Sequence, residues 1–500
     1  MDVRYTGDRS VCRHHVDNLR SASEQPAAID AYIASEVKVG RQAGPFPTPP
    51  MPNLIVSPLG TVPKDKGASH RVIHHLSYPH GGDSVNSKIE EMECVLASFD
   101  QGADLVRLAG RGALMTKIDI KAAYRCIPVR PADWHLLGMR WRGNYYYEKS
   151  LPFGLRSSCA LWEEYATAAE WIIRSYGITT LVHYIDDTLL VAPTGMHRAH
   201  AIMIIVLRVL AALGMPISKD KLIGPVTRLI YLGIQLDSIA MTASLGSDRL
   251  AEIKALLSEW TERKSCTHRE LLSLIGKLSF ATKVVRPGRI FLRRMLNLAA
   301  ATHGRPRLAL NDDFRADLRW WTASFEEWDG VSLLYDQEWA AAPAFNVTTD
   351  ACETGAGAVC GTAWFTHRWS SEELAAARTT GDGDRSMPYL ELLALAMAAA
   401  TWSSGGAWAG KRVTFHCDCE PVVHAVTKHT SPSPRIMHLI RTLFLIAARA
   451  HFEFRVVHIL GVSNDAADAL SRGQVESFRS KYPTSTPSPA TPSRLPTLSC

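Results

Sequence analysis

The stretch Leu-Val-His-Tyr-Ile-Asp-Asp-Thr-Leu-Leu-Val at residues 181–191 limits the possible folds of this chain more than any other. Two short runs rich in Leu, Val and Ile flank the adjacent carboxylates of Asp186 and Asp187. Each run is long enough for a β-strand and aspartate is acceptable in turns, so the pattern predicts a β-hairpin with both acids at its tip. Adjacent carboxylates repel each other unless a cation or water lies between them. Taken alone, an Asp-Asp pair is more simply interpreted as a solvated turn.

A second acid-bearing strand is predicted upstream of this hairpin. Residues 114–120 (Leu-Met-Thr-Lys-Ile-Asp-Ile) are typical of a strand with Asp119 near its end, and residues 121–124 then turn towards a helix. If Asp119 lies beside the hairpin tip, three carboxylates converge on one place. Such a cluster suits a pair of Mg²⁺ ions, because Mg²⁺ prefers oxygen ligands and substrate phosphates. Two ions about 3.5–4 Å apart stabilise both the attacking and the leaving oxygen in phosphoryl transfer.

Three segments resemble motifs of reverse transcriptases, and they occur in the order found in that family. Residues 184–187 (Tyr-Ile-Asp-Asp) resemble the YxDD signature, and residues 119–124 resemble the first catalytic aspartate with its downstream aromatic residue. Residues 151–158 (Leu-Pro-Phe-Gly-Leu-Arg-Ser-Ser) resemble the segment between them. The resemblance implies an α+β right-hand polymerase with fingers, palm and thumb. It also implies two Mg²⁺ ions, replaceable by Mn²⁺, and three catalytic, metal-binding residues: Asp119, Asp186 and Asp187.

The same resemblance implies a clamp for the incoming deoxynucleoside triphosphate. Lys64 and Arg71 are expected on either side of a fingers turn that contains Gly67. Lysine offers a point charge and arginine a planar fork to phosphate oxygens. A solvated charged loop is the alternative interpretation.

Four further residues are implied to contact the nucleotide. Tyr124 resembles the steric gate whose ring excludes a ribose 2′-hydroxyl, although a core tyrosine is the alternative. Phe153 and Gly154 are expected to line the floor beneath the new base pair, where glycine allows a close backbone approach. Lys221, preferred to Lys219 on spacing, is expected near the pyrophosphate leaving group, where it would donate a proton.

Composition indicates an ordinary globular chain. Its length of 500 residues predicts two to four domains. Hydrophobic residues make up 46% and charged residues 21%, which is typical of a chain able to bury several cores. Lys and Arg exceed Asp and Glu by 55 − 49 = 6, an excess that permits a nucleic-acid partner without demonstrating one. The ten cysteines lack the spacing of a zinc site, which favours reduced thiols. Residues 1–20 lack the apolar core of a signal peptide. The apolar run 201–210 is too short to span a membrane. We expect an intracellular protein of the cytoplasm, the nucleus or both, not secreted and with no membrane partner.

Four acids follow alternating strand and helix patterns in the C-terminal half. Strand-acid, helix-acid, strand-acid, helix-acid is the order of ribonuclease H domains, which this stretch resembles. The resemblance implies an α/β domain with a mixed sheet flanked by helices, and two Mg²⁺ ions held by Asp350, Glu391, Asp418 and Asp468. Each acid alone has a simpler interpretation, such as a helix-start acid for Glu391. His458 matches a mobile histidine that shuttles protons or helps release product, or it is a strand histidine without a catalytic part.

Residues about 240–300 are predicted to be helical and basic. Arg289 and Arg293 are four residues apart and are expected to share a helical face. The segment is interpreted either as a thumb that tracks duplex phosphates or as a solvated helix face. The basic residues are Lys277, Lys283, Arg286, Arg289, Arg293 and Arg294.

The predicted domains follow from these patterns, and residues 40–46, 56–64 and 71–79 resemble the polymerase entry of DIRS-like, tyrosine-recombinase retroelements. His75 stands where that subfamily usually has an acid. The tail is Ser-, Thr- and Pro-rich and predicted to be disordered. The domains are 1–44 (N-terminal segment with one helix), 45–237 (fingers and palm), 238–342 (mainly helical thumb and connection), 343–472 (ribonuclease H-like domain) and 473–500 (disordered tail).

Two functions are compatible with these patterns. The first is an RNA-directed DNA polymerase with ribonuclease H activity, from a retroelement. Its partners would be an RNA template, a DNA primer, the RNA–DNA hybrid, deoxynucleoside triphosphates and other proteins of the same element. The alternative is an inactive, domesticated or relic nucleic-acid-binding protein that retains the fold. A decayed copy is expected to lose carboxylates, and all seven are present, which favours the enzyme.

Overall fold

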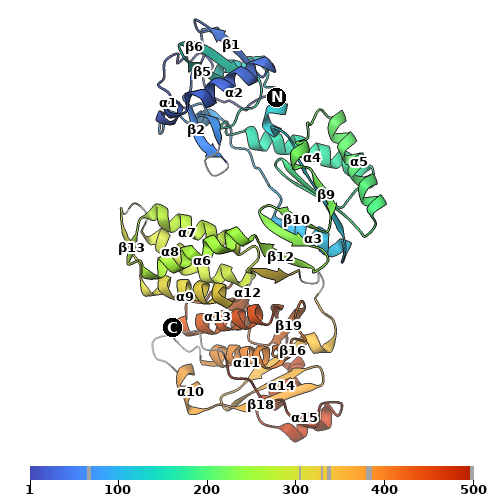
Figure 1. Cartoon of the computed structure of the whole chain (residues 1–500). Coiled ribbons are helices and arrows are strands. Elements are labelled where there is room, and N and C mark those ends of the chain that lie inside the picture. The colour runs from blue at the N-terminus through green and yellow to red at the C-terminus, as the bar shows by residue number, and fades with distance from the viewer. Residues whose placement is uncertain are drawn as a thin grey trace. The chain divides into compact units, whose positions relative to one another are not determined.

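The computed structural model of this chain describes residues 1–64, 69–302, 304, 306–327, 330–334, 339–378 and 386–495. The chain packs as two units, Met1–Leu229 and Ile230–Cys500 (Figure 1). Gly67, expected in the fingers turn, lies outside the described residues. Among the described helices, none combines the length and the apolar character needed to cross a membrane.

The first unit consists of short strands and of helices that cover them. Its helices are α1 (Arg20–Glu24), α2 (Pro26–Lys38), α3 (Phe99–Ala109), α4 (Ser158–Ser175) and α5 (Met196–Ala212), with 3₁₀ helices η2 (Asn86–Lys88), η3 (Ala123–Cys126), η4 (Pro131–Leu137) and η5 (Lys219–Lys221). Its strands are β1 (Gln42–Phe46), β2 (Leu59–Lys64), β3 (Ser69–His74), β4 (Leu114–Asp119), β5 (Gly138–Trp141), β6 (Asn144–Glu148), β7 (Leu181–Tyr184), β8 (Asp187–Ala192) and β9 (Ile223–Val226).

A four-stranded antiparallel sheet of order β7-β8-β4-β9 forms the centre of this unit. The hairpin predicted over residues 181–191 is β7 and β8, with only Ile185 and Asp186 between the strands. Helices α4 and α5 pack against the sheet. Their apolar residues recur at helical spacing and join the strands in one buried cluster that includes Trp162 and Leu210.

The N-terminal part of the first unit adds a three-stranded sheet, β1-β6-β5, and the β2–β3 hairpin. Two helices occur where one was predicted, because Gln25 precedes Pro26 and leaves the helical conformation, with φ −131° and ψ 53°. The buried guanidinium of Arg125 lies 2.7 Å from Glu36 of α2 and 2.6 Å from Glu148 of β6. Since removing one partner of a buried ion pair is strongly destabilising, this triad fixes η3 against both elements.

The second unit begins with β10, which crosses the boundary between the units, and ends with α15. Its strands are β10 (Arg228–Tyr231), β11 (Ile234–Asp237), β12 (Thr242–Leu245), β13 (Ser265–Cys266), β14 (Leu308–Ala309), β15 (Val331–Leu333), β16 (Asn346–Ala351), β17 (Gly355–Cys360), β18 (Ala363–Arg368), β19 (Arg412–Cys417) and β20 (Glu453–His458). Its helices are α6 (Ser247–Glu262), α7 (His268–Ala281), α8 (Arg293–Ala301), α9 (Asp312–Glu327), α10 (Ser371–Ala377), α11 (Ser386–Ser403), α12 (Glu420–Thr427), α13 (Pro434–Arg449), α14 (Asp465–Ser471) and α15 (Val475–Lys481), with 3₁₀ helices η6 (Arg286–Leu292), η7 (Pro343–Phe345) and η8 (Gly461–Ser463).

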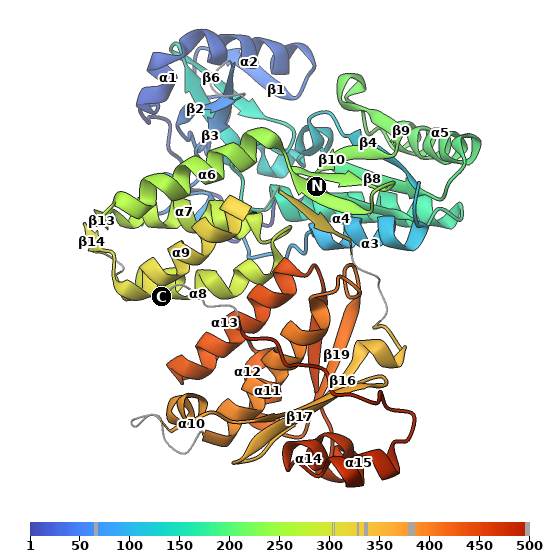
Figure 2. The same cartoon turned by 60° about the horizontal axis from the view of Figure 1, so that its bottom comes forward.

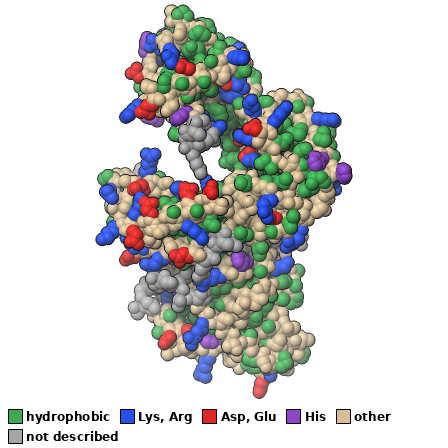
Figure 3. Space-filling model, viewed as in Figure 1, with side chains coloured by type: hydrophobic (Ala, Val, Ile, Leu, Met, Phe, Trp, Pro, Cys, Tyr) green, Lys and Arg blue, Asp and Glu red, His purple; other side chains and the backbone are tan. Residues whose placement is uncertain are grey.

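Residues 238–342 are mainly helical, as predicted, and pack in the same unit as residues 343–472. Helices α6 to α9 carry acids among their basic residues: Lys277 lies 2.8 Å from Glu252, and Arg294 lies 3.1 Å from Asp313. Figure 3 shows the two signs of charge intermixed over these helices. The charge of the predicted basic stretch is therefore partly balanced within it.

The helical face expected for Arg289 and Arg293 does not form, because the two residues belong to different elements. Arg289 lies in η6 and Arg293 begins α8. A 3₁₀ helix has three residues per turn, so the four-residue spacing of an α-helix does not carry through it. The side chain of Arg286 lies outside the described residues.

The C-terminal sheet has the order β18-β17-β16-β19-β20. Strands β18, β17 and β16 are antiparallel neighbours, whereas β16, β19 and β20 run parallel, so the sheet is mixed, as predicted for residues 343–472. Helix α11 packs against β16 and against α13 (Figure 2). Every residue of α11 from Leu390 to Ala399 is buried, as expected for a helix apolar on nearly all sides.

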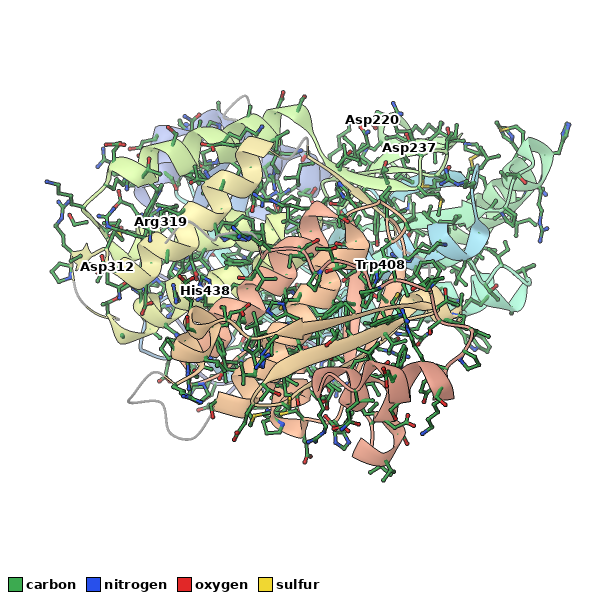
Figure 4. The ribbon with its side chains drawn as sticks, turned by 90° about the horizontal axis from the view of Figure 1, so that it is seen from below. Asp220, Asp237, Asp312, Arg319, Trp408 and His438 are labelled. Atoms are coloured by element: carbon green, nitrogen blue, oxygen red, sulfur yellow. The ribbon has the colours of Figure 1, made fainter. Side chains whose placement is uncertain are left out.

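Helix α13 also joins the sheet to the helices of residues 238–342. Its Arg441 lies 3.0 Å from Asp317 of α9, and both side chains are buried. Burial raises the pKa of Asp317 to about 6, against the lowering effect of Arg441 and Arg294. Figure 4 labels His438 on α13 and Arg319 on α9, the two helices that this pair connects.

The prediction of disorder from residue 473 is wrong for residues 475–495. Helix α15 buries Phe478, whose ring lies 5.3 Å from that of Trp364 on β18. The backbone amides of Thr486 and Ala490 then donate to the carbonyls of Thr362 and Trp364, at 2.9 and 2.8 Å. Hydrogen bonds to an edge strand require no apolar side chains, so a polar composition does not exclude them.

Candidate functional site

The first acidic cluster lies where β4 meets the tip of the β7–β8 hairpin. Asp119 ends β4 and is the cross-strand partner of Asp187, the first residue of β8. Asp186 occupies the turn, and its carbonyl accepts a hydrogen bond of 2.8 Å from the amide of Ile120. Three acids that are up to 68 residues apart in sequence are therefore brought together by two adjacent strands.

Two lysines and a serine contact these acids. Lys221 Nζ lies 2.9 Å from Asp119 Oδ2, and Ser218 donates a hydrogen bond of 2.6 Å to Asp119 Oδ1. Lys117 Nζ lies 3.1 Å from Asp187 Oδ2. The lysine selected on spacing thus reaches the cluster, whereas Ser218 and Lys117 carry no sequence signal of their own.

The electrostatics of the first cluster favour a bound cation. Burial raises the pKa of the Asp186 carboxyl, and the charges of Asp187 and Asp119 add to this effect. The hydrogen bond to Asp119 raises the pKa of Lys221, which stays charged. An all-oxygen donor set with crowded negative charge fits Mg²⁺, so Asp119, Asp186 and Asp187 are able to hold it.

Three of the residues expected at the nucleotide, Arg71, Phe153 and Tyr124, form a row beside this cluster. The guanidinium of Arg71 lies 5.2 Å from the centre of the Phe153 ring, and that ring lies 5.3 Å from the ring of Tyr124. Burial raises the pKa of Tyr124, with contributions from Cys159 and from Asp186. Lys64 ends β2 with an exposed side chain, on the strand that pairs with the strand of Arg71.

Gly154 is required by the backbone that carries Phe153. Its φ is +106°, and a Cβ atom there would lie 2.1 Å from the carbonyl oxygen of His74. Asn86 holds the same loop: its side-chain amide donates to Gly154 O at 2.7 Å, and its Oδ1 accepts from the amide of Arg156 at 2.9 Å. Sequence reasoning missed Asn86, since its contacts lie about 70 residues away along the chain.

The second acidic cluster lies at the carboxyl ends of two central strands of the C-terminal sheet. Strands β16 and β19 are parallel with Thr348 opposite His416, so Asp350 and Asp418, two residues further on, lie at the same end of the two strands. Ligand atoms of Glu391, Cys417 and Asp418 lie within 4.8 Å of one another.

Helix α14 carries Asp468 to the same cluster by packing directly on β17. A Cβ atom on Gly357 would lie 2.3 Å from the carbonyl oxygen of Ala467, so only glycine allows this approach. Ser471 of the same helix donates a hydrogen bond of 2.6 Å to Asp350 Oδ2. Asn464 is the N-cap residue of α14, but its side chain makes no capping hydrogen bond. It donates instead to Thr349 O at 3.0 Å and to Asp350 Oδ1 at 3.4 Å.

The charges of the second cluster are strongly coupled. Burial raises the pKa of Asp350 to about 6, with further raising by Asp418 and Asp468. Burial also raises the pKa of Glu391 to about 9, together with the charges of Asp350 and Asp418. Four converging carboxylates fit two Mg²⁺ ions, because cations would remove this repulsion.

His458 lies beside the second cluster at the exposed end of β20. Its Nε2 lies 3.1 Å from the backbone carbonyl of Asp418, to which the imidazole donates. All the residues selected from the sequence for this cluster are therefore near one another, together with Cys417, Asn464 and Ser471.

Comparisons with known proteins agree with the first cluster. Residues 64–236 match the family model described as reverse transcriptase (RNA-dependent DNA polymerase). Protein P of duck hepatitis B virus (strain China) is 28% identical over 257 residues, which cover 50% of this chain and 30% of that protein. Polyprotein P3 of Commelina yellow mottle virus is 23% identical over 383 residues, which cover 74% of this chain and 18% of that protein. The chain spans less than a third of the length of these curated relatives.

Solved structures share the fold. A foamy viral protease-reverse transcriptase in complex with double-stranded DNA matches with a TM-score of 0.53 and 15% identity, covering 91% of this chain and 73% of that one. A structure of the foamy viral enzyme with an RNA/DNA hybrid matches with a TM-score of 0.50 and 15% identity, covering 91% and 56%. These likenesses are consistent with a right-hand polymerase fold. Residues 64–236 of this chain form a reverse transcriptase domain.

Proposed function

We propose that this protein is an RNA-directed DNA polymerase that also cleaves the RNA strand of RNA–DNA hybrids. The observation that carries the proposal is the convergence of Asp119, Asp186 and Asp187 within the reverse transcriptase domain. Its partners are an RNA template, a DNA primer and deoxynucleoside triphosphates. The foamy viral structures that share the fold contain double-stranded DNA or an RNA/DNA hybrid, which supports nucleic acid as the partner.

In the first reaction the primer 3′ hydroxyl attacks the α-phosphate of a deoxynucleotide. Mg²⁺ bound to the three aspartates would lower the pKa of the hydroxyl and stabilise charge on the phosphate oxygens. Arg71 binds the triphosphate, and the rings of Phe153 and Tyr124 support the base and exclude a 2′-hydroxyl. Lys221 donates a proton to the departing pyrophosphate.

The mixed sheet and the second cluster support the proposed hybrid cleavage. Asp350 and Asp418 lie at the same end of the adjacent parallel strands β16 and β19, and Glu391 and Asp468 approach them from α11 and α14. Mg²⁺ bound there would activate a water molecule and balance charge on the departing 3′ oxygen. His458 lies at the exposed rim, where its imidazole takes up or returns a proton.

We further propose that the chain belongs to a retroelement related to the DIRS-like group and acts inside the cell, in the cytoplasm or the nucleus. The sequence between residues 40 and 79 supports that relationship, and the ten cysteines without zinc spacing support a reducing compartment. Other proteins of the same element are expected partners.

Primer extension on an RNA template tests both activities in one preparation. Asp186→Asn is expected to abolish DNA synthesis, a loss of at least about 1,000-fold, and to spare hybrid cleavage. Asp468→Asn is expected to do the reverse. The readouts are extension of a labelled primer and shortening of a labelled RNA strand, each at several Mg²⁺ concentrations.

Matched controls replace exposed acids near each cluster. Asp220→Asn and Glu476→Gln change charge to the same extent at exposed positions on η5 and α15, and both activities are expected to persist. If the wild type performs neither reaction and still binds hybrid, the relic interpretation replaces the proposal. If Asp186→Asn and Asp468→Asn leave both activities intact, the site assignments are wrong.

A further inference from the structure

The imidazole of His183 lies between two carboxylates beneath the catalytic hairpin. His183 is on β7, three residues before Asp186. Its Nδ1 lies 2.5 Å from Glu170 Oε2, and its Nε2 lies 2.9 Å from Glu163 Oε1. The two glutamates are seven residues apart on α4, two helical turns, and therefore project from the same face. The side chain of His183 is only 11% exposed.

The protonation state of His183 follows from its partners. An ionised carboxylate only accepts hydrogen bonds, whereas a neutral imidazole donates from only one nitrogen. Both contacts are therefore made when the ring is an imidazolium. Burial lowers the pKa of His183, but the hydrogen bonds and charges of Glu170 and Glu163 outweigh it and raise the pKa above its ordinary value. With Arg174 paired to Glu170 at 2.7 Å, the four side chains are neutral in sum.

The same helix holds the hairpin at two further points. Arg174 donates to the carbonyl of Leu181 at 3.0 Å, at the start of β7. Trp162 Nε1 donates to the carbonyl of Ile185 at 2.8 Å, in the turn itself. Ile185 has φ +53°, a conformation that a β-branched residue adopts only when its surroundings enforce it. Helix α4 therefore fixes the strand before Asp186 along its whole length.

A cavity of about 20 Å³ lies beside His183 and is large enough for one water molecule. Ile120 just after β4, Thr188 of β8 and Leu210 of α5 contribute to its lining and carry no charge. From the segment before α3, the thiol of Cys94 lies close enough to Glu163 to interact with its charge. The charged side chains bonded to the His183 imidazole are Glu163 and Glu170, both on α4.

We propose that the His183 imidazolium, clamped by Glu163 and Glu170, is a positioning residue that holds Asp186 in place for DNA synthesis. The inference rests on the proposed polymerase function of the first cluster. A group whose pKa is raised on folding stabilises the fold below its ordinary value, and this stabilisation is lost as the pH rises through the raised value. The clamp therefore holds below the raised pKa of His183, where the imidazolium and both carboxylates are charged, and loosens as the pH rises through that pKa.

Steady-state kinetics across a pH series tests the positioning role. His183→Gln is expected to lower kcat about 10- to 100-fold with KM for the nucleotide little changed, since His183 does not touch the nucleotide. The decline of kcat on the alkaline side is expected to disappear with it. Glu163→Gln keeps the imidazole but removes one charge, so the decline is expected at lower pH. His197→Gln, an exposed histidine on α5, is the matched control and should behave as wild type.

A titration independent of activity separates this inference from the proposed function. The full-length protein is labelled at histidine Cε1 for NMR. The resonance of His183 is expected to titrate with a midpoint above about pH 6.5, and this midpoint is expected to fall in Glu163→Gln. Titration at or below 6.5, or wild-type kcat in His183→Gln, would overturn the inference.

If the wild type makes no DNA, the proposed function fails. Hydrogen exchange then still tests whether His183 holds the hairpin that carries Asp186. The Ile120 amide, which is bonded to Asp186 O, is then expected to exchange faster in His183→Gln than in wild type. An unchanged rate would overturn the clamp, because the hairpin would hold its place without the imidazolium.

Discussion

The two acidic clusters of this molecule balance the repulsion between buried carboxylates in different ways. In the first, Lys221 and Lys117 contact Asp119 and Asp187 directly. In the second, Arg472 is as exposed as Lys221 (55% and 56%) but pairs with the exposed Asp468 at 2.8 Å, and the buried Asp350 accepts hydrogen bonds from the uncharged Ser471 and Asn464. Burial and the neighbouring acids raise the pKa values of Asp350 to about 6 and of Glu391 to about 9, so protons rather than cationic side chains offset the charge of these two acids.

Both clusters offer carboxylate oxygens, yet their geometry is expected to depend on a bound metal cation to different degrees. The first cluster has lysines that compensate charge before any metal binds, so its geometry is largely set by the fold. The second has four carboxylates that do not all ionise together without cations, because like charges at short range disfavour each other. Proposed Mg²⁺ binding at the second cluster is therefore coupled to proton release, and its geometry depends more on pH.

A closely packed glycine lies near each cluster, Gly154 in the loop of Phe153 and Gly357 under α14, and replacing each is expected to give the largest separation of the two activities. Gly154→Ala places a Cβ atom 2.1 Å from His74 O at φ +106°, and Gly357→Ala places one 2.3 Å from Ala467 O. Because backbone must move in both cases, we expect about a 100-fold loss of DNA synthesis for the first and of hybrid cleavage for the second. The other activity should persist in each variant, as measured by primer extension and RNA cleavage.

Two glycines in open surroundings provide the controls. Gly143 has φ +82°, and a Cβ atom there would meet no described residue within 4 Å, so Gly143→Ala isolates backbone strain from steric overlap. Gly246→Ala isolates the loss of glycine itself, since Gly246 has neither a positive φ nor a described neighbour within 4 Å of its Cβ position. If either control removes an activity as strongly as Gly154→Ala or Gly357→Ala, the close approach of another backbone does not explain why these positions need glycine.

The positions of the acids were predictable from sequence because each depends on local patterns. A short strand pattern that ends in an acid predicts a strand that presents the acid near its end, and this holds for Asp119 and Asp350. The mixed sheet was implied by the resemblance to ribonuclease H domains. Resemblance to known families then supplied the pairing of distant segments, which periodicity alone does not give.

The groups that support the acids were not predictable, because their partners are set by tertiary contacts. Ser218 and Ser471 are ordinary polar residues until folding places them 2.6 Å from Asp119 and Asp350. Asn464 likewise contacts Asp350 only because α14 packs beside β16. The tail beyond residue 473 was mispredicted for the same reason: its order comes from the packing of Phe478 on Trp364 and from backbone hydrogen bonds to the carbonyls of Thr362 and Trp364.

In a pH series without Mg²⁺, we expect the hydrogen-exchange protection of the two sheets to differ, by less than the glycine variants differ in activity. The folded-state pKa values of Asp350 and Glu391 lie above their ordinary values, so their stabilising effect is present at about pH 4 and is lost as the pH rises to about 9. We expect the amides of β16 and β19 to lose protection equivalent to about 2–3 kcal/mol over this range, after correction for intrinsic exchange.

Addition of Mg²⁺ is expected to restore that protection at high pH. Glu391→Gln cannot ionise and should flatten the pH dependence in the absence of Mg²⁺, which makes it the matched control. The amides of β4 and β8 should change less, since lysines already offset the charge of the first cluster. Equal pH dependence in both sheets would contradict the distinction between compensated and proton-dependent clusters.

The smallest effects are expected from removing one cationic partner at each cluster. Lys117 and Asp187 are about 20% exposed, whereas Arg472 and Asp468 are 55% and 42% exposed. Because water and salt screen exposed pairs more strongly, we expect Lys117→Gln to destabilise the β4–β8 region by about 1 kcal/mol and Arg472→Gln to destabilise α14 by less than about 0.5 kcal/mol. Hydrogen exchange at low and high salt measures both. If Arg472→Gln has the larger effect, the cationic side chain of Arg472 offsets the charge of the second cluster. The acids of that cluster would then be less protonated than their burial implies.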